Sequence, residues 1–169
     1  MRKSAEIFVA ATAGLLSPSS AFAEEPSPPG LTFVFEEVVT LAPNILVGPT
    51  ALGTRNIVPI TGGRFSGPGI SGTIIPGGWD WQLRRSDGCT QIEANYMLRT
   101  DDGVVINIIN KGLSCAGPDG NRIPVKTYPV FEPPLGKYEW LGKSTFVGKL
   151  EATSENGQHA VRIRLYKVG

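Results

Sequence analysis

Five polar residues between positions 79 and 115 recur at alternate positions, and they combine three ionisable groups with two amides, a set that could support acid–base chemistry. They are Asp80, Gln82, Glu93, Asn95 and Lys111. Side chains two residues apart in a β-strand project from the same face. Two neighbouring carboxyl groups beside a lysine can hold different protonation states, which is the arrangement that general acid–base catalysis uses. The pattern therefore predicts Asp80 and Glu93 as a catalytic acid and base.

This prediction depends on the register of a three-stranded antiparallel meander, which two turn signals define. Asp87-Gly88 is typical of a two-residue hairpin turn, and Asp101-Asp102-Gly103 of a three-residue turn. The first turn places Gln82 opposite Glu93, and the second places Glu93 opposite Lys111. The other face is then apolar: Trp79, Trp81, Leu83, Ile92, Ala94, Tyr96, Leu98, Ile106 and Ile108. A slip of one residue would exchange the two faces.

The two cysteines fall into the same register. The three-residue turn places Cys89 directly opposite Cys115 on the adjacent strand. A disulfide between them requires this opposition and an oxidising compartment. We predict that the two residues are bonded; the alternative is two separate small core residues.

The N-terminus is typical of a secretory signal peptide. Arg2 and Lys3 precede a short apolar run at 7–16, and Ala21-Phe22-Ala23 has the form of a cleavage site. The run is too short to span a bilayer; the alternative is a buried N-terminal helix. We predict a signal peptide at 1–23, a Pro-rich leader at 24–30 and one domain at 31–169. The protein is then secreted, periplasmic or extracellular, with no membrane insertion after cleavage.

Frequent glycine and proline residues and short β-rich runs predict an all-β domain. Besides the meander, the expected strands lie at 31–40, 56–65, 71–75, 123–131, 144–153 and 159–168. We place 123–131 at a sheet edge because Pro124 and Pro129 interrupt it, and Asn156-Gly157 predicts the last hairpin. About eight to ten antiparallel strands without a covering helix predict a single antiparallel β-barrel or a sandwich.

Several classes of function lack support. The net charge is +1 and the basic residues are scattered, so we expect no nucleic-acid partner. The Gly67–Gly72 segment matches G-x-G-x-x-G, but a strand follows it where a dinucleotide site requires a helix. His159 is the only histidine, which leaves too few ligands for zinc and no triad of the usual kind. We expect no metal and no cofactor.

A longer string of motifs resembles a known family. The motifs are Gly53-x-Arg55, Thr61-Gly62-Gly63-Arg64-Phe65-x-Gly67-Pro68, Gly72, Pro76-Gly77-Gly78, Asp80-Trp81-Gln82, Glu93, Tyr96, Leu98-Arg99-Thr100, Asp102-Gly103, Gly112 and Trp140-Leu141. The chain is similar to the domain-of-unknown-function family numbered 3237, also called uncharacterised protein family 0311. The resemblance implies a compact antiparallel β-barrel and no particular activity. Glu93 replaces the aspartate more usual in the family, and the cysteine pair is not part of its pattern.

Three functions remain open. The first is a cofactor-free acid–base enzyme, of isomerase or lyase type, acting on a small oxygenated molecule. The second is a non-catalytic carrier of a small-molecule ligand, and the third is a secreted structural or interaction module with a filled barrel. A cavity of about 300 Å³ or more would favour the first two. Homo-oligomer formation stays open.

Which face of the meander lines the barrel distinguishes the candidate sites. If the polar face is the solvated outside, Glu93–Lys111 is a surface ion pair worth at most about 1 kcal/mol. If the apolar face lines the lumen, Trp79, Trp81 and Tyr96, by default core residues, form the walls of a pocket for an aromatic or terpenoid-like ligand. We favour a polar lumen, because the family motif joins Asp80 to Trp81 and repeats an acid at Glu93. The expected ligand-binding residues are Arg64, Trp81, Gln82, Asn95 and Lys111.

Overall fold

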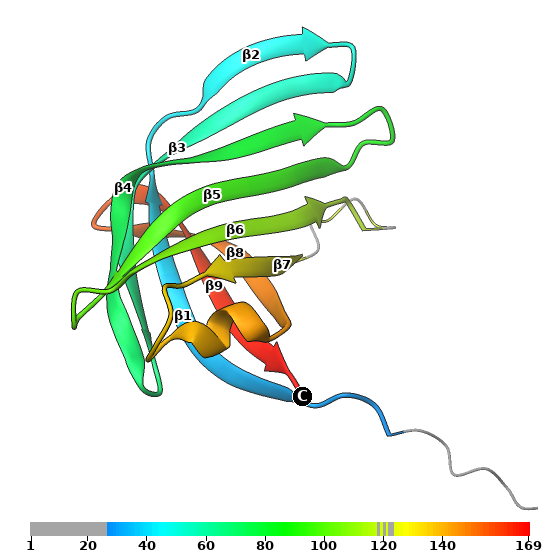
Figure 1. Cartoon of the computed structure of the whole chain (residues 1–169). Coiled ribbons are helices and arrows are strands. Elements are labelled where there is room, and N and C mark those ends of the chain that lie inside the picture. The colour runs from blue at the N-terminus through cyan, green and yellow to red at the C-terminus, as the bar shows by residue number, and fades with distance from the viewer. Residues whose placement is uncertain (1–26, 118, 120, 122–123) are drawn as a thin grey trace, which may run out of the picture.

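Alternating apolar residues and glycine-containing turns give nine strands and one short helix. The computed structural model describes residues 27–117, 119, 121 and 124–169. The elements are β1 (Leu31–Leu41), β2 (Ile45–Thr50), β3 (Gly53–Gly67), β4 (Ile70–Arg84), β5 (Thr90–Thr100), β6 (Val105–Ser114), β7 (Val125–Glu132), the 3₁₀ helix η1 (Glu139–Lys143), β8 (Phe146–Glu155) and β9 (Gln158–Val168) (Figure 1). The predicted signal peptide and residues 24–26 of the leader lie outside the described residues.

Eight of the strands close into an antiparallel barrel, which confirms the predicted fold class. Neighbouring strands follow the order β1-β9-β8-β7-β6-β5-β4-β3-β2, and a further pairing of β1 with β3 closes the ring. The long strand β3 serves two partners: Ile57 pairs with Ile45 of β2, and Arg64 pairs with Val38 of β1. β2 is therefore an additional strand beside the ring. No helix in the described part of the chain is long and apolar enough to cross a bilayer.

The hairpin between β4 and β5 differs from the prediction by one residue. Asp80 pairs with Ala94, and Trp79 pairs with Asn95. The loop has three residues, because the amide of Arg85 donates to the carbonyl of Cys89 at 2.8 Å. Gly88 has a φ of 82°, which is the left-handed residue that ends a three-residue hairpin loop. The predicted pairing of Gln82 with Glu93 is therefore wrong.

The second hairpin and the disulfide follow the prediction. Glu93 pairs with Lys111, and the amide of Thr100 donates to the carbonyl of Val104 at 2.9 Å around the three-residue turn. Cys89 and Cys115 are bonded. The bond joins the β4–β5 loop to the segment that follows β6.

β4 joins two strands that the sequence analysis expected to be separate, the short run at 71–75 and the first strand of the meander. It continues from Ile70 to Arg84 and passes through Pro76-Gly77-Gly78, where its register with β5 shifts between Ile75 and Trp79. Gly77, with a φ of 107°, lies inside this irregularity. A bulge of this kind bends a strand without ending it, so the Pro-Gly-Gly segment curves the barrel wall.

β7 is paired on both sides, so its assignment to a sheet edge is correct for only part of its length. It pairs with β6 from Lys126 to Glu132, but with β8 only from Val125 to Thr127. Pro129 therefore lies where β8 has already diverged. A proline has no backbone N–H to donate to a neighbouring strand. No such donor is needed toward β8 at Pro129, because β7 and β8 are paired only from Val125 to Thr127.

The two halves of the barrel have different contents. Around η1 the interior is filled by a cluster that includes Phe35, Phe65, Leu98, Phe131, Leu141 and Phe146. Toward the β4–β5 loop, polar side chains enter the lumen instead. The interior is thus closed at the η1 end and accessible at the other.

The final hairpin turns at Asn156-Gly157, where both residues have positive φ, as a two-residue type I′ turn requires. The predicted last hairpin is therefore confirmed.

Candidate functional site

A cavity of about 70 Å³ lies inside the lumen, above the packed core. Most of its wall is apolar, and five polar side chains interrupt it. These are Asp80, Gln82, Tyr96, Asn110 and Thr127, from β4, β5, β6 and β7. Apolar walls with a few convergent polar groups are typical of small-molecule sites.

Asp80 is the carboxyl group of this cavity. Its Oδ2 accepts a hydrogen bond from Gln82 Nε2 at 2.7 Å, and Gln82 Oε1 accepts one from Asn56 at 3.3 Å. Burial raises the pKa of Asp80, and the hydrogen bond from Gln82 lowers it only in part. The net direction is upward, so the neutral acid is favoured relative to an exposed aspartate.

A second buried carboxyl group lies behind Tyr96. Glu37 is fully buried, and its Oε2 accepts a hydrogen bond from the Tyr96 hydroxyl at 2.6 Å. Burial raises the pKa of Glu37 from 4.5 to about 7, and the bond from Tyr96 opposes this only in part. The pKa of Tyr96 is also raised, mainly by burial and secondly by the charge of Glu37. Glu37 therefore holds the phenol of Tyr96 at the cavity wall as a neutral group.

Three polar atoms in the cavity wall have no hydrogen-bond partner among the described residues. They are Oδ1 of Asp80, Oδ1 of Asn110 and Oγ1 of Thr127, all buried. A buried polar atom without a partner costs about 1–3 kcal/mol. Several such atoms converging on one cavity indicate a place where a bound molecule would complete the hydrogen bonds.

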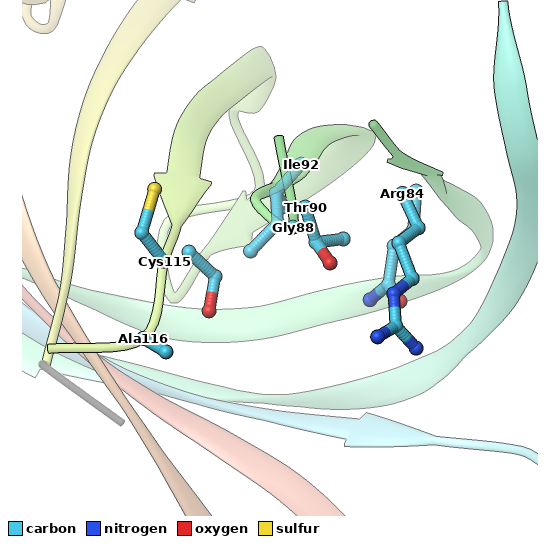
Figure 2. Close-up of a pocket in the computed structure, with 8 residues that line it drawn as sticks. Arg84, Gly88, Thr90, Ile92, Cys115 and Ala116 are labelled. Atoms are coloured by element: carbon cyan, nitrogen blue, oxygen red, sulfur yellow. The ribbon is translucent and has the colours of Figure 1, made fainter. Parts of the chain in front are cut away.

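The cavity continues toward the mouth of the barrel. A wider pocket of about 310 Å³ shares Gln82 and Ile92 with the inner cavity. Figure 2 shows Arg84 on one side of this pocket, Cys115 and Ala116 on the other, and Thr90 between them. We call these two adjoining spaces the funnel; its outer part is wide and polar, and its inner part is narrow and mostly apolar. The volume of about 300 Å³ expected of a small-molecule site is reached by the mouth pocket and not by the inner cavity.

The structure separates the residues that the sequence predicted as one site. Asp80 and Gln82 line the lumen, whereas Glu93 and Lys111 form an ion pair on the outside, with Nζ and Oε2 at 3.4 Å and each side chain about 40% exposed. The prediction that Asp80 and Glu93 share a face is therefore wrong. Its physical cause is the extra loop residue between β4 and β5, which reverses the faces of one strand against the other.

The remaining predicted ligand-binding residues also lie outside the lumen. Trp81 is 46% exposed, on the same outer face as Glu93, and Asn95 is exposed. Arg64 pairs with Glu155 on the surface of the barrel. Trp81, Lys111 and Arg64 therefore do not line the inner cavity. The predicted proximity of Arg64 to Asp80 is wrong, because Arg64 lies on the outer surface.

The sequence prediction missed four residues of the site: Glu37, Arg84, Asn110 and Thr127. It placed Tyr96 on the apolar face of the meander and not among the ligand-binding residues. A signal for two of them is present in the sequence. Asn110 follows Ile106 and Ile108 in the same alternation, and Glu37 lies between Phe35 and Val39. A polar residue in an apolar phase of a strand points to a buried polar group that needs a partner.

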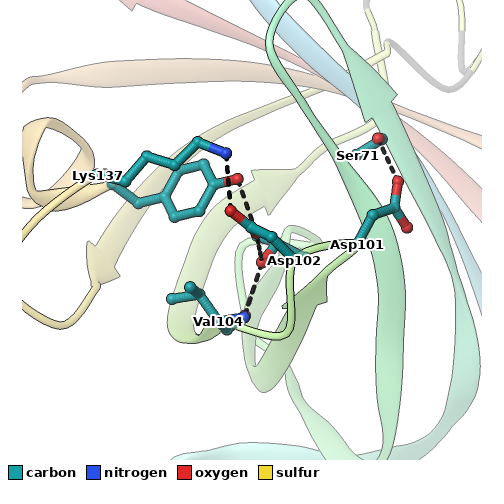
Figure 3. A network of polar contacts seen from close by, with 7 residues as sticks. Ser71, Asp101, Asp102, Val104 and Lys137 are labelled. Atoms are coloured by element: carbon teal, nitrogen blue, oxygen red, sulfur yellow. Dashed lines mark hydrogen bonds and ion pairs between the residues drawn. The ribbon is translucent and has the colours of Figure 1, made fainter.

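A separate polar network ties the β5–β6 turn to the segment before η1. Asp102 accepts hydrogen bonds from Lys137 Nζ at 2.7 Å, Thr100 Oγ1 at 2.5 Å and the Tyr138 hydroxyl at 3.0 Å (Figure 3). The bond from Lys137, followed by that from Thr100, holds the pKa of Asp102 well below its usual range. Both oxygens of the carboxylate accept hydrogen bonds, so this cluster connects the β5–β6 turn to the η1 segment at the closed end of the barrel.

The described residues contain no group of three or more His, Cys, Asp or Glu side chains placed to hold a metal ion. The polar groups that line the inner cavity are the carboxyl of Asp80, the phenol of Tyr96, the hydroxyl of Thr127 and the amides of Gln82 and Asn110.

The protein is thus a closed antiparallel barrel whose lumen is filled at the η1 end and open at the β4–β5 end, where polar side chains line it. The chain belongs to the family described as Protein of unknown function (DUF3237), whose model matches residues 29–168. A UPF0311 protein of Clostridium acetobutylicum is 32% identical over 148 residues, which cover 80% of this chain and 91% of that protein.

Two further relatives extend the comparison to structure and to chemistry. The crystal structure of a beta-barrel like protein from Acinetobacter baumannii superposes with a TM-score of 0.77 at 31% identity, covering 87% of this chain and 100% of that one. A hydroalkoxylation enzyme of Penicillium herquei is 29% identical over 129 residues, covering 76% of this chain and 79% of the enzyme.

Proposed function

We propose that this protein is a cofactor-free acid–base enzyme that binds a small oxygenated molecule in the lumen, with Asp80 as the group that transfers protons. The observation that supports this most is the convergence of unpartnered polar atoms of Asp80, Asn110 and Thr127 on one cavity. A barrel lumen that served only as a core would have no need of these groups.

The reaction class that suits the site is the addition of a hydroxyl group across a carbon–carbon double bond, or the reverse elimination. The raised pKa of Asp80 favours a carboxylic acid, which can donate its proton to the alkene carbon. The substrate hydroxyl then forms the carbon–oxygen bond and returns its proton to the carboxylate, so the acid is regenerated. The apolar wall would exclude water from the electron-deficient carbon.

The Penicillium herquei relative supports this choice, because its name describes addition of a hydroxyl group to an alkene. Its similarity covers most of both chains. No second carboxyl group is required in this scheme, since one carboxyl donates and then accepts the proton. Glu93, on the outer face, has no role in it.

Alkenyl phenols such as 2-(3-methylbut-2-enyl)phenol, incubated with the protein in D₂O, test the proposal. The expected product is the cyclic ether with one deuterium on carbon, detected by NMR and mass spectrometry. D80N should abolish the product, because the amide keeps the shape but has no acidic proton. E93Q is the matched control and should retain full activity.

Product formation that is equal in D80N and the unaltered protein would refute the role of Asp80. A protein that binds the phenols without converting them would instead favour the non-catalytic carrier. Circular dichroism and thermal unfolding establish whether D80N keeps the fold.

The compartment is a further part of the proposal. The Cys89–Cys115 bond is compatible with a periplasmic or extracellular location, and we infer export through the N-terminal segment at 1–23. N-terminal sequencing of protein recovered from the periplasm or medium should begin at Glu24. An N-terminus at Met1 would contradict export by cleavage.

A further inference from the structure

The mouth of the funnel carries a row of groups that the reaction scheme does not use. Arg84 pairs with Thr90 across β4 and β5, and Thr90 pairs with Ser114 across β5 and β6. The three side chains therefore stand side by side, and all three line the mouth pocket (Figure 2). A guanidinium group beside two hydroxyl groups supplies donors to an anion from adjacent positions.

Arg84 is available for such an anion. Among the residues that the structure describes, it forms no ion pair and no side-chain hydrogen bond, and the mouth pocket contains no acidic side chain. The acid in the adjacent loop, Asp87, is engaged by Arg85 and by the amide of Cys89. The positive charge at the mouth is thus uncompensated within the described protein.

The disulfide holds this row in place. Cys89 directly precedes Thr90, Cys115 directly follows Ser114, and the two cysteines are bonded. The covalent link is therefore the next rung after the Thr90–Ser114 pair. It prevents fraying of the two strand ends at the position where a ligand would approach, so the hydroxyl groups keep their spacing.

The distance between Arg84 and Asp80 limits the shape of a ligand that contacts both. Four residues along a strand correspond to about 13 Å at the backbone. Gln82 and Ile92 lie between the two levels, since both border the mouth and the inner cavity. A bridging ligand needs an anionic end, an apolar body and a reactive group at the inner end.

We infer that the substrate is an anionic amphiphile, with a carboxylate or similar group held by Arg84, Thr90 and Ser114 at the mouth and its apolar body in the lumen. This inference rests on the proposed function of the same lumen and adds the substrate class. Arg84 is a binding and specificity residue in this scheme, because it lies too far from Asp80 to contact the reacting atoms.

A pair of fluorescent probes that differ mainly in one charge tests this inference. 1-Anilinonaphthalene-8-sulfonate carries a sulfonate, and N-phenyl-1-naphthylamine has the same rings without it. The unaltered protein should bind both, and each should displace the other. R84Q should weaken binding of the sulfonate about tenfold, as expected for one charge-assisted contact, and leave the uncharged probe unchanged. R99Q, at the other end of β5, is the matched control and should resemble the unaltered protein with both probes.

Equal affinity of the sulfonate for R84Q and the unaltered protein would overturn the inference and leave the proposed function intact. Sulfonate binding that fails to displace the uncharged probe would also overturn it, because the anion would then lie elsewhere. Failure of the uncharged probe to bind the unaltered protein would count against the lumen as a binding site, and so against both proposals.

Discussion

Replacing Glu37 with glutamine should remove a pH dependence from the stability of the barrel. Glu37 is fully buried, and its pKa is raised from 4.5 to about 7, chiefly by burial. The folded protein therefore binds a proton more tightly than the unfolded chain does. Stability from this group is fully present below pH 4.5 and is lost as the pH rises through about 7.

The size of the effect follows from the two pKa values. A change from 4.5 to about 7 corresponds to about 3 kcal/mol in the free energy of unfolding. E37Q keeps the size of the side chain and its acceptor for Tyr96, but it cannot ionise. We expect E37Q to match the unaltered protein near pH 4.5 and to exceed its stability by about 2–3 kcal/mol at pH 8.

Urea unfolding, followed by the fluorescence of the three tryptophans, measures this difference between pH 4.5 and 8.5. E36Q is the matched control: Glu36 is the next residue in β1, but it pairs with Arg164 Nε at 2.8 Å and is only partly buried. E36Q should retain the pH dependence that Glu37 causes. A difference between E37Q and the unaltered protein that is the same at every pH would refute the reasoning.

Two further predictions concern the meander. The double variant C89A/C115A should unfold with a free energy lower by about 3 kcal/mol, because the bond closes a loop with a sequence separation of 26; a change below about 1 kcal/mol in urea unfolding would contradict this. K111M should change the stability by less than about 1 kcal/mol, because its pair with Glu93 is half exposed, and a larger loss in the same assay would assign this ion pair a structural role.

The local turns were predictable where their chemistry allows one loop length. Asn156-Gly157 requires two residues with positive φ, and the structure has both. Asp87-Gly88 is compatible with two lengths, because a glycine with positive φ can end either a two-residue turn or a three-residue loop. Sequence alone could not choose between them. The choice decided whether Asp80 shares a face with Glu93 or with Tyr96.

The closure of the barrel and the composition of the site depend on contacts that no local pattern encodes. β1 and β3 are joined by no hairpin, yet their pairing from Glu36 to Leu41 closes the ring. The cavity combines Asp80 from β4 with Thr127 from β7, and this proximity depends on the registers of β4 to β7. The resemblance to the family gave the barrel correctly, but the polar lumen inferred from its motif was right for Asp80 and wrong for Glu93.

The β4–β5 loop has a consequence for how members of such a barrel diverge. One residue added to or removed from Ser86-Asp87-Gly88 would shift the register of β4 against β5 by one, so one of these two strands would have to exchange its inner and outer side chains without any substitution. The length of this loop therefore helps to determine which side chains line the interior, although none of its own residues lines the inner cavity. We expect loop length here to be retained among relatives that share a substrate, while the loop's side chains drift.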